Sequence, residues 1–272
     1  MDASPPAGRD RLGRSGGSAP LGMKVTGERV STPEGGFRPT WERHVAGYAA
    51  AAELLPAEGA VLDVGCGTGH SYHLLDPRES VGVDIAAEAL GGQERRTIVA
   101  DMRALPLGDA SFASFLAVQS IEHVPDPERV LAEARRVLEP GGTAMFVTPN
   151  RLTFGRPDEI IDPYHDFEYD QHELRALCER FFDTVEMHGL YGSQRYLAVI
   201  EAERRRLDQL LRRDPLRLRR LLPRRARQRI YDAQLRRERA RPNPAAEAIE
   251  LEDFELRDSP LDEALDLVAV CR

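Results

Sequence analysis

The 272-residue sequence predicts an α/β fold built on a doubly wound, mostly parallel sheet. The first indication is a short apolar run at residues 60–64, typical of a parallel strand buried on both faces. The second is a Gly-x-Gly-x-Gly turn at residues 65–69, directly after that run. The third is a series of later apolar runs that end in carboxylates. Ligands bind at the carboxyl ends of the strands in such sheets, so these residues predict a site at one edge.

The glycine turn predicts close contact between backbone and ligand, because no Cβ stands in the way at Gly65, Gly67 and Gly69. We expect a helix over residues 68–75 whose free N–H groups face the same gap. A dinucleotide-binding turn would need glycine where His70 stands, and a phosphate loop would need Gly-Lys-Ser/Thr. The spacing therefore fits neither of these two ligand classes.

Further strands are expected at residues 80–84, 97–101, 115–118, 143–148, 184–190 and 264–271, and further helices at residues 127–138 and 170–182. The strand at residues 80–84 ends in Asp84, about 20 residues beyond the glycine turn. An acid at that place can accept both ribose hydroxyls of a nucleoside. The next strand ends in Asp101, and the one after it leads into Gln119 and His123.

This order of motifs resembles the class I S-adenosyl-L-methionine (SAM)-dependent methyltransferases, in particular the small-molecule enzymes of ubiquinone and menaquinone biosynthesis. Asp63 and Gly65 stand in the family's first motif, and Ile121-Glu122-His123 is close to its leucine-glutamate-histidine. The resemblance covers residues 40–191 and the last strand. It implies a Rossmann-like sheet of seven strands, the seventh antiparallel, with SAM as cofactor and S-adenosyl-L-homocysteine as product.

The resemblance also implies roles for individual residues. Asp84 would bind the ribose, and Asp101 would accept from the adenine amino group. Ile85 and Met102 would enclose the adenine ring. The residues expected at the cofactor are Asp63, Gly65, Cys66, Gly67, Gly69, Asp84, Ile85, Asp101, Met102, Gln119, His44 and Tyr48.

A helix is expected over residues 40–55, capped by Thr40. Trp41, His44 and Tyr48 fall on one of its faces at helical spacing. Such a face can simply pack on the sheet. The resemblance implies another use, because the family's N-terminal helix often closes over the cofactor. We therefore expect His44 and Tyr48 at the cofactor and Trp41 at the acceptor substrate.

A long loop follows the strand at residues 143–148 and carries the sequence Asp-Pro-Tyr-His-Asp-Phe-Glu-Tyr at residues 162–169. It leaves the carboxyl end of a central strand, so Tyr164 and His165 are candidates to touch the acceptor. The acids around His165 fix no ligand geometry, and no metal site is predicted.

His123 is expected to point at the transferred methyl group, where a neutral imidazole can take the acceptor's proton. The alternatives are that His123 only orients Glu122 or bonds to the backbone, or that His165 is the base. Two histidines near the expected site favour O-methylation of a hydroxyl on a small molecule. An RNA or protein methyltransferase, and a non-catalytic regulatory module that binds SAM, are the other functions left open.

Residues 193–257 are expected to form an α-helical insert, or lid, between the sixth and seventh strands, with helices starting near residues 194, 214 and 223. Residues 193–241 hold 17 arginines against 6 acids. These arginines either pair with the acidic body or bind an acidic substrate. A net charge of −8 and the lack of interleaved aromatic residues argue against a nucleic-acid partner.

Composition indicates the remaining boundaries. Residues 1–24 predict a disordered tail, and residues 25–192 with 258–272 predict the SAM-binding domain. Three scattered cysteines suit neither a disulfide framework nor a zinc site, and no membrane span is expected. These features favour a cytoplasmic protein. The sequence does not specify an oligomeric state.

Overall fold

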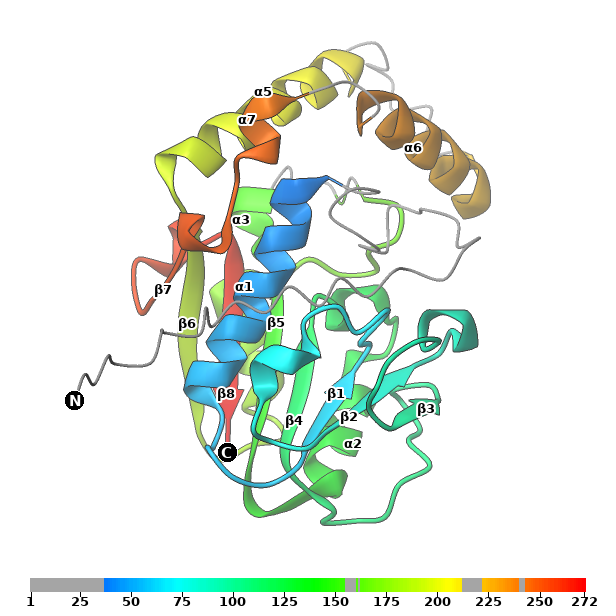
Figure 1. Cartoon of the computed structure of the whole chain (residues 1–272), viewed down its shortest axis with the longest axis vertical. Coiled ribbons are helices and arrows are strands. Elements are labelled where there is room, and N and C mark those ends of the chain that lie inside the picture. Colours follow the sequence, from blue (N-terminus) through cyan, green and yellow to red (C-terminus); the bar gives the residue numbers. More distant parts are fainter. Residues whose placement is uncertain (1–36, 155–159, 161, 212–221, 240–242) are drawn as a thin grey trace, which may run out of the picture.

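An eight-stranded sheet forms the centre of the protein, in the order β3-β2-β1-β4-β5-β8-β6-β7 (Figure 1). The computed structural model describes residues 37–154, 160, 162–211, 222–239 and 243–272. The strands are β1 (Val61–Val64), β2 (Ser80–Asp84), β3 (Thr97–Val99), β4 (Phe112–Val118), β5 (Leu138–Pro149), β6 (Val185–Gly192), β7 (Phe254–Arg257) and β8 (Asp266–Cys271). The predicted tail at residues 1–24 and the start of the predicted insert helix at residue 214 lie outside the described residues.

The strand directions confirm the predicted α/β sheet. β1 runs parallel to β2 and β4, and the parallel pairing continues to β3 on one side and β5 on the other. β8 lies antiparallel between β5 and β6. The strand order reverses between β1 and β4, the place where doubly wound sheets bind their ligands.

The sheet has one strand more than the seven that were predicted. β7 pairs antiparallel with β6 at the sheet edge, within the segment that the sequence assigned to the insert. Its side chains alternate between half-buried and exposed positions, as in an edge strand with one covered face. The guanidinium of Arg257 also lies over the ring of Tyr191, 4.0 Å from its centroid. Four residues with two charges give too weak a pattern to predict a strand.

Helices cover both faces of the sheet (Figure 1). On one face, Ala50 of the first helix packs with Leu116 and Val268. On the other face, Val130 and Leu174 from two helices pack with Phe146. The helices are α1 (Arg38–Leu54), α2 (Pro127–Val137), α3 (Arg151–Phe154), α4 (Gln171–Cys178), α5 (Gln194–Leu211), α6 (Arg224–Arg239) and α7 (Pro244–Glu247).

One predicted helix start is wrong, and one predicted helix does not form. α1 has Phe37 at its N-cap, and Thr40 lies inside the helix because Pro39 already suits the first turn. The helix predicted at residues 68–75 is absent, and only a 3₁₀ turn, Tyr72–Leu75, forms there. Gly67 and Gly69 have φ values of 53° and 66°, in the left-handed region, so the chain cannot enter a right-handed helix directly after the turn.

The insert lies above the end of the sheet at which β6 finishes. There α5 and α6 arch over the strand ends (Figure 1). Among the described residues, no helix has the length and apolar character needed to cross a membrane.

Candidate functional site

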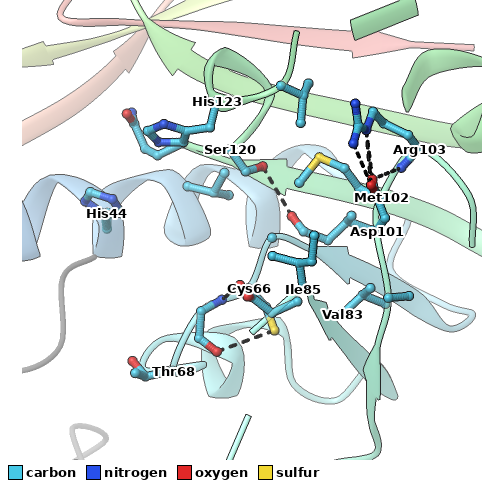
Figure 2. A pocket seen from close by; sticks show the side chains of 18 of the residues that line it. His44, Cys66, Thr68, Val83, Ile85, Asp101, Met102, Arg103, Ser120 and His123 are labelled. Carbon is cyan, nitrogen blue, oxygen red and sulfur yellow. Dashed lines mark hydrogen bonds and ion pairs between the residues drawn. The ribbon is translucent and has the colours of Figure 1, made fainter. Parts of the chain in front are cut away.

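A cavity of about 230 Å³ lies at the carboxyl ends of β1, β2 and β4, where the strand order reverses. Figure 2 shows Asp101 and Met102 on one side of it and His44 on the other. The predicted site residues that line it are Gly65, Cys66, Gly67, Asp84, Ile85, Asp101, Met102, Gln119, His44, Tyr48 and His123. The predicted residues that do not line it are Asp63, Gly69, Trp41, Tyr164 and His165.

The glycine turn presents bare backbone to the cavity. A Cβ on Gly65 would lie 2.5 Å from the Cβ of Ser120, so only glycine fits there. A Cβ on Gly67 would meet nothing within 4 Å, which leaves open space beside its backbone. Gly69 contacts the side chain of Gln93, which donates to the carbonyl oxygen of Gly67 at 3.0 Å and braces the turn.

Asp84 is held at the cavity wall by the backbone. Its carboxylate accepts from the N–H of Gly67 at 2.9 Å and from that of Ala86 at 2.8 Å. These bonds orient the carboxylate and connect β2 to the glycine turn. The neighbouring Ile85 is 67% exposed, an unusual position for an isoleucine in a cavity wall unless a flat apolar partner covers it.

Asp101 is partly engaged by its neighbour. Arg103 donates to the carboxylate through its backbone N–H at 2.9 Å and through Nη2 at 2.7 Å (Figure 2). The hydrogen bonds from Arg103 lower the pKa of Asp101, although burial acts the other way. The same guanidinium bonds to Asp126 at 3.1 Å. Sequence reasoning missed this interaction between Arg103 and Asp101, and its one signal is an arginine two positions after the acid.

Asp63 lies behind the cavity wall. The hydroxyl of Tyr48 donates to its carboxylate at 3.0 Å, and Arg95 forms an ion pair with it at 2.7 Å. Burial raises the pKa of Asp63, and the charge of Arg95 opposes that effect. The structure therefore places this acid where it positions Tyr48, and only the tyrosine reaches the cavity.

Two side chains on the aromatic face of α1, His44 and Trp41, have different surroundings. His44 lines the cavity, and its Nδ1 lies 2.8 Å from the carbonyl oxygen of Thr40. Burial lowers the pKa of His44 to about 4, so its ring is uncharged at neutral pH. Trp41 instead stacks on His70, with 4.1 Å between the ring centroids.

Gln119 marks the end of β4. It has a φ of 50°, which is uncommon for a residue with a side chain. Its Nε2 donates to the carboxylate of Asp266 at 2.7 Å. Asp266 is fully buried and also accepts from Nε of Arg43 at 2.7 Å. This Arg43–Asp266 pair, which the sequence did not reveal, holds Gln119 at the cavity.

His123 forms the cavity wall on the side away from the glycine turn. Its Nδ1 lies 3.1 Å from the carbonyl oxygen of Tyr164, which fixes Nδ1 as the donor. The predicted loop thereby meets the end of β4 through the backbone of Tyr164.

His165 stands next to His123, with 5.0 Å between the ring centroids. Its Nδ1 lies 3.1 Å from Oε1 of the buried Glu168. Burial acts to lower the pKa of His165, but the bond to Glu168 and the nearby carboxylates raise it above its ordinary value. The two predicted bases are therefore neighbours in different settings, and only His123 reaches the cavity.

Helix α6 packs on the same loop. The Tyr164 hydroxyl donates to Asp232 at 2.8 Å, and Tyr231 donates to Asp162 at 2.9 Å. Arg224 forms an ion pair with Asp166 at 2.7 Å. No sequence pattern predicted these contacts, because about 60–70 residues separate the partners.

Comparison with known proteins gives consistent results. A family model described as "Methyltransferase domain" matches residues 62–146. A probable S-adenosylmethionine-dependent methyltransferase of Mycobacterium tuberculosis is 34% identical over 189 residues, which span 65% of this chain and 68% of that protein. Tocopherol O-methyltransferase of Arabidopsis thaliana is 29% identical over 136 residues, 45% of this chain and 38% of that protein.

The fold is also similar to that of a solved SAM-dependent methyltransferase from Thermotoga maritima. The two share a TM-score of 0.58 at 19% identity, over 86% of this chain and 91% of the other. This match extends well beyond residues 62–146, the segment that the family model covers.

Proposed function

The chain belongs to the SAM-dependent methyltransferases, and we propose that this enzyme methylates a hydroxyl of a small-molecule acceptor. Membership of the family makes SAM the cofactor and sets aside a non-catalytic module. The observation that carries the proposal is that His123 lines the cavity while its Nδ1 is bonded to the Tyr164 carbonyl oxygen.

The cavity suits SAM in three respects. Bare backbone at Gly67 leaves room for a ligand to lie against it. Asp84, already oriented by two N–H groups, would accept the ribose hydroxyls. The exposed Ile85 and the half-buried Met102 would enclose the adenine ring, and Asp101 would accept from the adenine amino group beside its bonds to Arg103. Gly65, Cys66, Gln119, His44 and Tyr48 would complete the wall.

SAM supplies a methyl group already activated on a sulfonium. The chain's own residues must then orient the acceptor, exclude water and remove a proton from the hydroxyl. Among the described residues, Nε2 of His123 has no recorded hydrogen-bond partner, while Nδ1 is committed to Tyr164. We place the acceptor oxygen beside this nitrogen, which takes the hydroxyl proton as the new C–O bond forms.

The acceptor side is covered by the insert, which supports a small acceptor. Arg224, Tyr231 and Asp232 of α6 all bind the loop that carries His165. The hydroxyl is favoured by the two imidazoles beside the cavity and by the named reaction of the Arabidopsis relative, an O-methyltransferase.

Single-turnover kinetics test the proposal. Protein preloaded with SAM is mixed with a panel of hydroxyl-, amine- and thiol-bearing small molecules, and formation of S-adenosylhomocysteine is followed. We expect turnover with a hydroxyl acceptor, and a loss of about 10²- to 10⁴-fold in rate for His123→Ala with SAM affinity unchanged. His172→Ala, an exposed histidine on α4, is the control. Turnover confined to amines or thiols would refute the proposal.

A further inference from the structure

Three potential ligand groups meet at the wall of the cavity, beside His123. Glu122, His123 and His165 each offer one nitrogen or oxygen atom, and these atoms all lie within 4.8 Å of one another. Glu122 and His123 belong to a single 3₁₀ turn, Ile121–His123, at the end of β4. His165 comes from the loop some forty residues later. The group differs from the acidic cluster around His165 that the sequence offered, because two of its members come from the turn.

The loop is locked to the turn by its backbone. The N–H groups of Asp166 and Phe167 both donate to the carbonyl oxygen of Glu122, at 2.8 and 3.1 Å. The carbonyl oxygen of Tyr164 accepts from His123. These bonds fix where His165 stands relative to Glu122 and His123, so the juxtaposition does not depend on side-chain contacts alone.

Each of the three side chains is oriented from outside by a second group. Nδ1 of His123 faces the Tyr164 carbonyl, and Nδ1 of His165 faces Glu168, both at 3.1 Å. The hydroxyl of Thr148 donates to Oε2 of Glu122 at 3.0 Å. Histidines that bind a metal ion through one nitrogen almost always donate the other N–H in this way to a carbonyl or carboxylate.

The remaining oxygen of Glu122 points to a missing partner. Glu122 is 1% exposed, and its Oε1 is buried with no hydrogen bond. Oε2 of Glu168 is also buried without a hydrogen bond. A buried carboxylate oxygen without a partner is costly, and native proteins rarely leave one so. A cation between the carboxylates and the imidazoles would satisfy it.

We propose that Glu122, His123 and His165 bind one divalent transition-metal ion of the Zn²⁺ or Fe²⁺ class. Two imidazoles and one carboxylate suit these borderline ions, whereas Mg²⁺ and Ca²⁺ prefer sites made of oxygen alone. Three protein ligands leave further positions open for substrate, and one of the three, His123, lines the cavity.

The site would deepen the proposed function, on which its chemical use rests. With the ion bound, His123 would serve as a ligand instead of as the base proposed above, and the acceptor hydroxyl would bind the ion and release its proton to water. The O–CH₃ bond forms as the S–CH₃ bond breaks, and the products are the methyl ether, S-adenosylhomocysteine and one proton. A metal ion lowers the pKa of bound oxygen ligands, so a separate base is not needed.

Metal titration of the full-length protein tests the site. Chelator-treated protein is titrated with Zn²⁺ against a chromophoric chelator, and Co²⁺ reports the ligand set by its visible spectrum. We expect one tight equivalent, weakened about a hundredfold or more by Glu122→Gln and by His165→Ala, and about tenfold by Glu168→Gln. The control is His188→Ala, which removes a histidine on β6 that is paired with Asp258 at 2.7 Å, outside the proposed site. Thermal unfolding of each variant identifies loss of fold.

The absence of a tight site, or a tight site that survives both Glu122→Gln and His165→Ala in folded protein, would overturn the proposal. The two proposals fail separately. Tight metal binding without methylation of any hydroxyl refutes the proposed function and keeps the metal site. Methylation of a hydroxyl by protein that binds no metal keeps the function and refutes the site.

Discussion

The two halves of the cavity are built in different ways. The cofactor half comes mainly from the continuous segment 63–103, in which the backbone N–H groups of Gly67 and Ala86 both donate to the carboxylate of Asp84. The acceptor half combines three distant segments, represented by His123, His165 and Arg224. A local backbone motif carries its geometry within its own sequence, whereas side chains gathered from afar depend on the whole fold. The halves therefore should respond differently to substitution.

The Arg43–Asp266 pair beneath the cavity should give the largest effect. Asp266→Asn keeps the shape of the side chain but leaves Arg43 buried without its counter-charge. Breaking a buried pair in this way costs about 3–5 kcal/mol. We expect a loss of that size in the free energy of unfolding, measured by urea denaturation. A change in the free energy of unfolding below about 1 kcal/mol would mean that the Arg43–Asp266 pair contributes little to the stability of the fold around the cavity.

Loss of Asp84 should act on the cofactor half alone. Asp84→Ala removes the proposed ribose contact and the acceptor for the Gly67 N–H. We expect SAM affinity, measured by calorimetry, to fall by about 1–3 kcal/mol. Asp183→Ala, an exposed acid outside the cavity, is the control. Unchanged affinity in Asp84→Ala would remove this residue from the cofactor site.

His70, which lines the cofactor half of the cavity, should make the stability of the protein depend on pH. Burial, with smaller contributions from His44 and His73, lowers the pKa of His70 to about 3. Between about pH 6.5 and pH 3 the unfolded chain binds a proton that the folded protein excludes, so stability falls as pH falls. We expect His70→Gln to reduce the loss between pH 7 and pH 4 by ~1–2 kcal/mol. Equal losses in both proteins, by denaturation at each pH, would contradict this.

The smallest effect should come from the lid. Tyr231→Phe removes one hydrogen bond to Asp162, and Arg224→Ala removes an exposed ion pair with Asp166. Each contact is worth about 0.5–1 kcal/mol. We expect KM for the acceptor to rise two- to fivefold while SAM affinity stays constant. A matching fall in SAM affinity would show that the lid serves both halves and would weaken the comparison.

The same contrast explains what the sequence can predict. The predicted strands follow from local apolar patterns and were confirmed, and the antiparallel direction of β8, which the family resemblance implied, was confirmed as well. The helix after the glycine turn was wrong because positive φ at Gly67 and Gly69 outweighs the apolar pattern beyond them.

Side-chain partners were the part that the sequence could not supply. The ion pairs that fix Asp63 and Asp266 join residues 32 and 223 positions apart. The meeting of His165 with Glu122 needs a loop whose course depends on backbone bonds to the 3₁₀ turn. Contacts between residues so far apart produce no regular spacing that could be recognised in a single sequence.

The most direct test of the account is the identity of the atom that receives the methyl group. The enzyme is incubated with SAM carrying a ¹³C-labelled methyl group and with the hydroxyl-bearing acceptor that supports turnover, and the product is examined by NMR. The account predicts a single new resonance in the range of a methyl ether. A label found on nitrogen, sulfur or carbon would contradict it.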